Sequence, residues 1–561
     1  MLEGKPHRRK PYRVEEFSPD AFDKALGREP LDEFDKRRPF PEEIAEHPQA
    51  TNLYTHLEKL GVKTIVVEKT YVDGSFLTDY ATFYATVFAR FDRFCKRVHF
   101  FSLPFEESRF LRYLMLRDRR SDEIESFAAS YLGFVVSRPL PKAVVGRTVL
   151  APIPTRPGEG SRYYRAVVDT PVNLFGAHLT VENSLPFQQQ DRAVAACATV
   201  ALWSAFFRTA AMFGTPAARP SAITRAATTS LYQDRAWPST NLTIDQICEA
   251  VRVNGLEPEV FDLERTNKIP VLSLIRAYLE AGLPVVLGVE HKGSLHAVTA
   301  VGYRQSASPK MKRELEPQLH DTPSVARAID VLYCHDDNIG PFAEFGIRGN
   351  RHGGHIRLTS KLYPIPSGKT PSETAQPSDG ELTKSTKPKK PGSADLDIVY
   401  VIIPCNDSVR LNFGAVQEWV TSLDLTLLKI LGKSLIETRV WDVKLTTTSV
   451  LKRDITSDTI SHAEKIDFLT EAQPRFMWQI SFRTGAGEAF RLFADASAFE
   501  LSLPLRRAII FDRKLVHETA VVLKETDDAD IPGAAELAHF FTGELAREIG
   551  ESSTQAGEPA L

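Results

Sequence analysis

The pattern of apolar and polar residues predicts an α+β unit in the first third of the chain. Aromatic residues recur at helical spacing along residues 76–101, which predicts a long helix. Runs of β-branched residues interrupted by glycine and proline predict strands, at residues 63–69, 131–150 and 166–181. We therefore expect an N-terminal α+β domain over residues 51–182. Residues 1–50 are charged and rich in proline, and we expect them to form a flexible segment.

The middle of the chain places its predicted helices before its predicted strands. An uncharged, alanine-rich stretch predicts a helix buried on most faces at residues 197–213. Thr243 and Gln246 have the spacing of a capping box, which predicts a second helix that ends at Gly255. A third helix is predicted at residues 271–281, and strands follow at 284–289, 296–303 and 328–334. This order indicates a further α+β domain, which we bound at residues 183–364.

The last third begins with a stretch that is almost free of apolar residues. Residues 365–396 are rich in proline, serine and lysine, which is typical of a disordered linker or loop. Residues 397–550 then predict a C-terminal α+β domain, with strand runs at 398–403, 477–482, 489–493 and 508–511 and helices at 413–431 and 534–549. The strand at 398–403 could instead complete the sheet of the middle domain. Residues 551–561 are expected to be a disordered tail.

The composition of the chain indicates which kinds of binding partner are not expected. The chain has 69 basic and 72 acidic side chains, and this balance gives no basic face for a nucleic acid. The longest uncharged run, residues 193–207, is too short for a membrane span, and no apolar stretch follows the charged start as in a secretory signal. We therefore expect a cytoplasmic protein with neither nucleic acid nor membrane as partner. Oligomeric state is left open.

The five cysteines are an odd number and form no CxxC pair, so neither a disulfide framework nor a zinc ribbon is expected. One of them has a setting that suits catalysis. Cys197 would begin the buried helix, and a helix start favours the thiolate form of a cysteine. His296 opens a later strand and could act as the base, and an acid that follows the next strand, Asp336 or Asp337, could orient its ring.

Three segments carry a resemblance to a known family: QQQDRAVAACATVALW, SLHAVTAVGY and VLYCHDDNIG. Their order and setting resemble papain-like cysteine peptidases, and most closely the C39-like peptidase branch, over residues 185–345. The resemblance implies that Cys197 is the nucleophile, His296 the general base and Asp336 the group that orients it. It implies an oxyanion donor at Gln190. The family usually has glutamine six positions before the cysteine, where this chain has Asp191.

The resemblance implies a thiol protease, a hydrolase that cleaves a peptide or isopeptide bond in a protein or peptide substrate with a catalytic triad and without cofactor or metal. An acyltransferase or deamidase would use the same triad. A catalytically inactive scaffold or interaction protein would keep the fold without the reaction. In that case Cys197 would be a small core residue, and the two aspartates would be turn formers.

Two other groupings of reactive residues compete with this set. Cys95 and His99 are four residues apart and would share one face of the helix predicted at 76–101. His352 and His355 flank two glycines and could provide half of a metal site, although zinc needs three or four ligands. We expect the first pair to be core residues and the second to be loop histidines.

Overall fold

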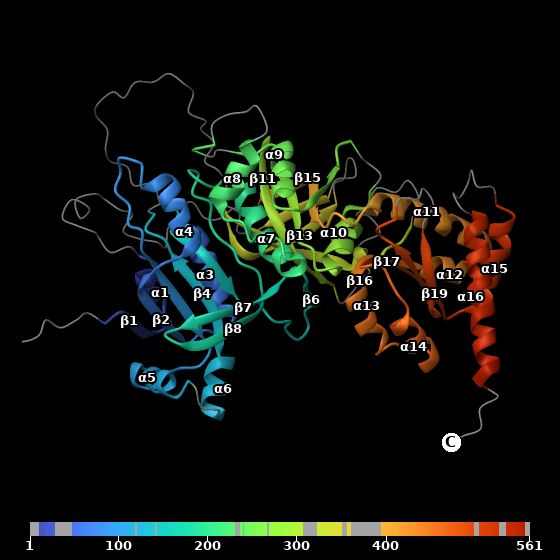
Figure 1. Cartoon of the computed structure of the whole chain (residues 1–561), viewed down its shortest axis with the longest axis horizontal. Coiled ribbons are helices and arrows are strands. Elements are labelled where there is room, and N and C mark those ends of the chain that lie inside the picture. Colours follow the sequence, from blue (N-terminus) through green and yellow to red (C-terminus); the bar gives the residue numbers. More distant parts are fainter. Residues whose placement is uncertain are drawn as a thin grey trace, which may run out of the picture.

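The protein consists of three α+β units that follow one another along its long axis (Figure 1). Its computed structural model describes residues 10–27, 48–117, 121–140, 143–229, 236–238, 241–265, 269–306, 322–349, 356–360, 394–498, 504–526 and 534–555. Among these residues, no helix combines the length and the apolar character needed to cross a bilayer.

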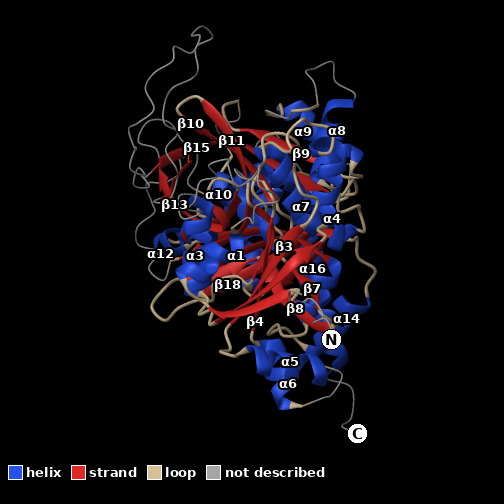
Figure 2. Cartoon of the chain, turned by 90° about the vertical axis from the view of Figure 1, so that its left-hand side faces the viewer, coloured by secondary structure: helices blue, strands red, loops and turns tan. Residues whose placement is uncertain are grey.

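The N-terminal unit is built on an antiparallel sheet of five strands in sequence order, β1 (Tyr12–Glu16), β2 (Thr64–Tyr71), β3 (Cys95–Phe101), β4 (Tyr131–Ser137) and β5 (Val145–Leu150). Alternate residues of β2 enter different cores: Ile65 and Val67 face one, and Val66 faces the other. Two helices cover the first face, α1 (Pro19–Leu26) and α3 (Pro48–Lys59). The second face is covered by α5 (Glu107–Leu116), α6 (Asp122–Ala129) and the hairpin of β7 (Val168–Leu174) and β8 (Ala177–Ser184). Figure 2 looks onto this unit from the end of the molecule.

Two expectations for this unit are wrong. The long helix predicted at residues 76–101 is instead α4 (Gly74–Asp79), one turn of π-helix, η2 (Tyr80–Tyr84), a loop and the strand β3. Pairing of β3 with both β2 and β4 decides its conformation, and aromatic spacing alone did not reveal those partners. Within the segment predicted to be flexible, β1 pairs with β2 and α1 buries Phe22, Ala25 and Leu26. Residues 1–9 and 28–47 lie outside the described part.

The middle unit is an antiparallel β-barrel of six strands, β10 (Val285–His291), β11 (Ser294–Gln305), β12 (Ile329–Asp336), β13 (Gly340–Gly349), β14 (Ile356–Ser360) and β15 (Ala394–Cys405). Pairing between β10 and β15 closes it. Two further strands extend it, β9 (Glu257–Asp262) beside β15 and β6 (Ser161–Tyr164) beside β11.

Four helices accompany the barrel: α7 (Cys197–Phe213), α8 (Pro220–Thr229), α9 (Ile244–Val253) and α10 (Val271–Glu280). The predictions for α7, α9 and α10 are confirmed, and both hydrogen bonds of the capping box between Thr243 and Gln246 are present. The helix α7 packs against barrel residues Val286, Ala297 and Ile402. Its first residue therefore lies over the outer surface of the barrel.

The strand β15 belongs to the barrel. It pairs with β10, β14 and β9, so the alternative that the run at 398–403 completes the middle sheet is confirmed. Most of the predicted linker, residues 365–393, lies outside the described residues. A middle unit bounded at residue 364 would lack the strand that closes it.

The C-terminal unit has an antiparallel sheet of β16 (Val440–Thr447), β17 (Phe476–Thr484), β18 (Gly487–Asp495) and β19 (Leu505–Ile510). Its helices are α11 (Phe413–Ile430), α12 (Lys433–Thr438), α13 (Thr448–Ile455), α14 (His462–Thr470), α15 (Arg513–Lys524) and α16 (Ala534–Gln555). One hydrophobic core continues from the barrel through α10 and α11 into this sheet. The barrel and the C-terminal sheet are therefore packed as one body.

Candidate functional site

Cys197 is the first residue of α7, as expected. The residue before it, Ala196, provides no side-chain cap, so the first N–H groups of the helix have no intrahelical partner and no capping side chain. The positive end of the helix dipole lies at the same place. The cysteine is 9% exposed. The cysteine therefore lies, largely buried, at the N-terminal end of the helix.

His296 lies on β11, the barrel strand beneath α7. Its neighbour Ala297 lines a pocket together with Cys197, and the hydroxyl of Thr299 donates to the carbonyl of Ala201 at 2.9 Å. These contacts fix the helix on the strand. The His296 ring is largely buried, with 10% of its side chain exposed. The Cys197 side chain lies close enough to this ring to help raise its pKa.

Asp336 ends β12 and meets the other side of the imidazole. The distance between Nε2 of His296 and Oδ1 of Asp336 is 2.9 Å, and the same oxygen accepts the N–H of Asn338 at 2.8 Å. Because Nε2 faces the aspartate, Nδ1 is the ring nitrogen left for the sulfur. The side-chain amide of Asn338 also lies 3.2 Å from Nε2. Sequence reasoning missed Asn338, although it stands in the turn that supplied both aspartates.

The charge of Asp336 controls the imidazole. Burial lowers the pKa of His296, but the charge and the hydrogen bond of Asp336 raise it, as do the contact with Cys197 and the charge of Asp337, and the net result is a pKa well above 6.5. The net shift favours the protonated form of the ring. A protonated imidazole beside a sulfur stabilises the thiolate.

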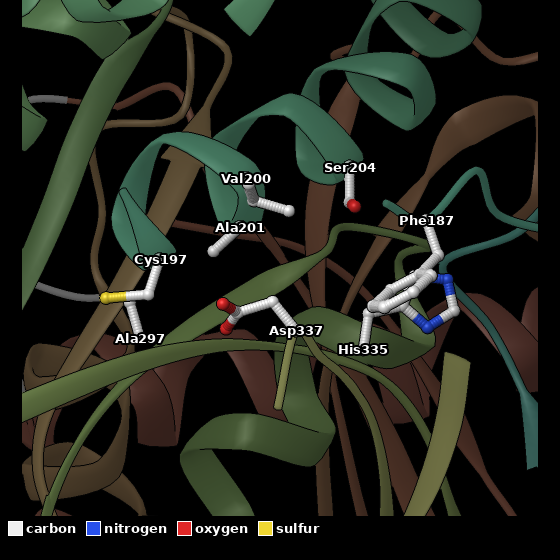
Figure 3. A pocket seen from close by; sticks show the side chains of 8 residues that line it. All are labelled: Phe187, Cys197, Val200, Ala201, Ser204, Ala297, His335 and Asp337. Carbon is white, nitrogen blue, oxygen red and sulfur yellow. The ribbon is translucent and has the colours of Figure 1, made fainter. Parts of the chain in front are cut away.

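Asp337 is a second buried carboxyl at the same ring. One of its oxygens lies 3.5 Å from Nε2 of His296, a longer contact than that of Asp336, and it has no hydrogen-bond partner among the described residues. Burial, reinforced by the charge of Asp336 and opposed by that of His296, raises the pKa of Asp337 to about 7. Figure 3 shows its carboxylate between α7 and the barrel, in the pocket lined by Phe187, Cys197, Val200, Ala201, Ser204, Ala297, His335 and Asp337.

The glutamine cluster before the helix has three different environments. Gln190, the expected oxyanion donor, is half-buried, and no hydrogen bond joins its side chain to another described residue. Gln189 hydrogen-bonds through its backbone and side chain to the backbone of Val145. Gln188 is buried, and its amide nitrogen has no partner among the described residues. Of the three glutamines, Gln188 is the one whose buried amide donor lacks a hydrogen-bond partner among the described residues.

Asp191 cannot replace a glutamine as oxyanion donor. Its Oδ1 accepts the N–H groups of Ala193, Val194 and Ala195 at 3.0, 2.9 and 2.9 Å. Its Oδ2 accepts the hydroxyl of Tyr84 at 2.6 Å. An ionised carboxylate only accepts hydrogen bonds. The backbone N–H of Cys197 lies at the uncapped end of the helix, on the same residue as the sulfur, and is available as an oxyanion donor.

A cation is the other species that this cluster could hold. His296, Asp336 and Asp337 offer ligand atoms that all lie within 4.8 Å of one another. The hydrogen bond to Asp336 uses the Nε2 atom that such an ion would need. Metal binding and orientation of the ring by Asp336 are therefore mutually exclusive. His352 and His355 lie outside the described residues.

The rival pair does not form a site. Cys95 and His99 lie on a strand instead of the helix on which the pairing depended, and four residues along a strand separate two Cα atoms by about 13 Å. His99 hydrogen-bonds to Tyr131 and Glu68 in the core. Beside the candidate site, His335 is also structural, because its ring contacts the carbonyl of Leu185 and the N–H of Phe342.

Comparison with known proteins identifies no protein similar to this chain. No family model, no curated protein and no solved structure matches the chain. The functional argument therefore depends on the residues of the site.

Proposed function

We propose that this protein is a papain-like cysteine peptidase that cleaves a peptide or isopeptide bond with Cys197, His296 and Asp336. One observation carries the proposal. A cysteine at a helix start, a histidine from a barrel strand and an aspartate from the next strand come together: Asp336 hydrogen-bonds to His296, and the Cys197 side chain helps to raise the pKa of the same imidazole. The six-strand barrel and the three sequence segments that resemble the family support the same conclusion.

In the proposed reaction, the Cys197 thiolate attacks the carbonyl carbon of the scissile bond. The carbonyl oxygen becomes an oxyanion, which the N–H of Cys197 and the helix dipole stabilise. The C–N bond then breaks, and the His296 imidazolium gives its proton to the leaving amine, so that a thioester remains on the sulfur. His296 next takes a proton from water, which attacks the thioester and releases the carboxylic acid. Asp336 keeps the ring oriented and stabilises its positive charge.

The surroundings of the site suggest the class of substrate. Cys197 is only 9% exposed, so a narrow, extended protein or peptide segment fits better than a folded surface. All five cysteines are free, and thiol chemistry needs a reducing compartment, so we propose a cytoplasmic location. The proposed mechanism uses no cofactor. The N- and C-terminal units would select the substrate or bind a partner.

The test is alkylation of the native protein with iodoacetamide, followed by mass-spectrometric mapping of the modified cysteines. We expect Cys197 to react faster than the other four. In His296→Ala, which removes the general base, its rate should fall by about 100-fold. A matched control is His291→Gln, because His291 lies on the neighbouring strand outside the cluster and should leave the rate unchanged.

Equally slow labelling of all five cysteines in the wild-type protein would refute the enzyme and favour a scaffold that keeps the fold. For a reactive Cys197, incubation with peptides and a primary amine separates two outcomes. New carboxyl termini support hydrolysis, whereas amine adducts would indicate acyl transfer through the same thioester.

A further inference from the structure

The backbone just before the candidate nucleophile is held in a tight turn by a single carboxylate. Besides the three N–H groups that Asp191 accepts, Arg192 has a φ of +58° and its N–H donates to the carbonyl of Ala195 at 3.1 Å. Only Ala196 separates this turn from the first residue of α7. The position of the Cys197 N–H group therefore depends on where the Asp191 side chain is held.

The N-terminal unit holds that side chain. Tyr84, at the end of η2, donates its hydroxyl to Oδ2 of Asp191 at 2.6 Å. Its ring packs in the core of the N-terminal unit beside Phe76 and Phe91. Burial and the charge of Asp191 raise the pKa of Tyr84 far above 10, so the phenol keeps its proton and remains the donor.

A second residue of the N-terminal unit contacts the same segment. Arg138 follows β4, and its Nη2 donates to the carbonyl of Gln189 at 2.8 Å, while its Nε donates to the carbonyl of Ala143. From the middle unit, the hydroxyl of Thr224 on α8 donates to the carbonyl of Val194 at 2.8 Å. The segment that leads to Cys197 is thus fixed at several backbone groups.

The other half of the site is held from the same side. Two residues of α3 donate to the turn that carries the aspartates: Gln49 to the carbonyl of Asp337 and Asn52 to the carbonyl of Ile339, each at 3.0 Å. The N-terminal unit therefore contacts the turn before Cys197 and the turn after Asp336. These two turns carry the nucleophile and the acid of the site.

We propose that the N-terminal unit contributes to the reactive site. In this proposal Tyr84 is a positioning residue that holds the Cys197 N–H group where it can donate to the oxyanion. This inference rests on the proposed function. Loss of the hydroxyl would remove the hydrogen bond that joins Asp191 to the N-terminal unit and let the turn shift. A shift of about 1 Å in a catalytic group costs roughly 100-fold in rate.

Two small probes separate the position of the oxyanion donor from the reactivity of the sulfur. With 4-nitrophenyl acetate, the sulfur attacks the ester carbonyl, an oxyanion forms, and the C–O bond breaks to give the acetyl thioester and 4-nitrophenolate. With iodoacetamide, the sulfur displaces iodide from carbon and no oxyanion forms. In Tyr84→Phe we expect Cys197 acetylation to fall about 10-fold or more while alkylation stays within about 2-fold.

Three variants complete the experiment. Tyr80→Phe is the matched control, because Tyr80 is a half-buried tyrosine of the same helical turn, and both rates should stay unchanged. Asp191→Asn keeps an oxygen for the three N–H groups and offers an N–H to the Tyr84 oxygen, so it should acetylate faster than Tyr84→Phe. Arg138→Lys removes a second contact from the N-terminal unit and should also lose acetylation selectively. If Tyr84→Phe does not fold, Arg138→Lys still tests whether the N-terminal unit positions the oxyanion donor.

Each result has a defined meaning. Unchanged acetylation and alkylation rates in Tyr84→Phe and Arg138→Lys overturn the inference. An equal fall of both rates also overturns it and would indicate a purely structural role. Neither of these results affects the proposed function. Failure of wild-type Cys197 to react faster than the other cysteines with either probe would overturn both proposals.

Discussion

Two buried carboxylates meet one imidazole at the end of β12. Asp336 lies closer to the ring and also accepts the Asn338 N–H, so the positive charge of His296 is matched by this residue. Asp337 has no equivalent partner, and an uncompensated buried charge is costly. The raised pKa of Asp337, about 7, is the consequence. At this scale Asp336 is the hydrogen-bond partner of the imidazole, and Asp337 is the carboxyl that takes up a proton near neutral pH.

This difference predicts how stability depends on pH. A carboxyl whose pKa is raised from 3.8 to about 7 by folding contributes stability below pH 3.8, and the contribution is lost as the pH rises through 7. Asp337→Asn removes the cost of ionisation. Its free energy of unfolding, measured with urea, should exceed that of the wild type by about 1 kcal/mol or more at pH 8, and by less at pH 5.

The control for this measurement is Asp407→Asn, which changes an exposed aspartate. It should change the free energy of unfolding by the same amount at pH 5 and at pH 8. An equal stability gain for Asp337→Asn at pH 5 and pH 8 would contradict the raised pKa, because it would show that the carboxyl is ionised in the folded protein throughout this range.

Helices and strands that are specified by residues close together in the chain can be predicted from the sequence. Elements that depend on partners far along the chain cannot. The capping box fixes the start of α9, and the apolar run gives the full extent of α7. By contrast, β3 was predicted to be helical, because the aromatic spacing gave no information about the strands on either side. The strand β15 also depends on partners that precede it in the chain.

The pairing of β14 with β15 predicts a tolerated deletion. Ser360 lies directly opposite Ala394 in this antiparallel pair, so a short glycine-containing turn can join the two residues. Replacing residues 361–393 by such a turn should preserve the fold and the Cys197 alkylation rate. Stability, measured by urea unfolding, should rise by about 1–2 kcal/mol, because a shorter connection costs less closure entropy.

Truncation after residue 360 is the contrasting variant. It removes β15, and with it the pairings to β10, β14 and β9, so we expect no cooperative unfolding transition. A folded, thiol-reactive truncated protein would contradict the assignment of β15 to the barrel.

At the scale of the whole molecule, the three units support one another around the site. The N-terminal unit contacts both turns that carry its residues, and the C-terminal unit shares a continuous core with the barrel. A buried ion pair crosses this second boundary: Nη1 of Arg276 on α10 lies 2.5 Å from Oδ1 of Asp442 on β16. The middle unit is therefore held from both sides.

This ion pair predicts a large loss of stability. Asp442→Ala leaves the guanidinium of Arg276 buried without its partner and should lower the free energy of unfolding by about 3–5 kcal/mol. The double variant Arg276→Met/Asp442→Leu should recover most of the loss. Glu257→Ala, which breaks the exposed pair with Arg252, is the control and should cost no more than about 1 kcal/mol. Equal effects of the buried and exposed pairs in urea unfolding would contradict the packing described.

The sequence alone determined the features that depend on residues close together in the chain. It gave the starts of α7 and α9, most strands, and the chain order of Cys197, His296 and the acidic turn. Tertiary structure decided which aspartate lies closer to His296, that Asp191 orders a turn, that residues 95–101 form a strand, and that β15 closes the barrel. Helix caps and side-chain periodicity depend on neighbours three or four residues apart, whereas pairing and burial depend on partners that only the folded chain brings together.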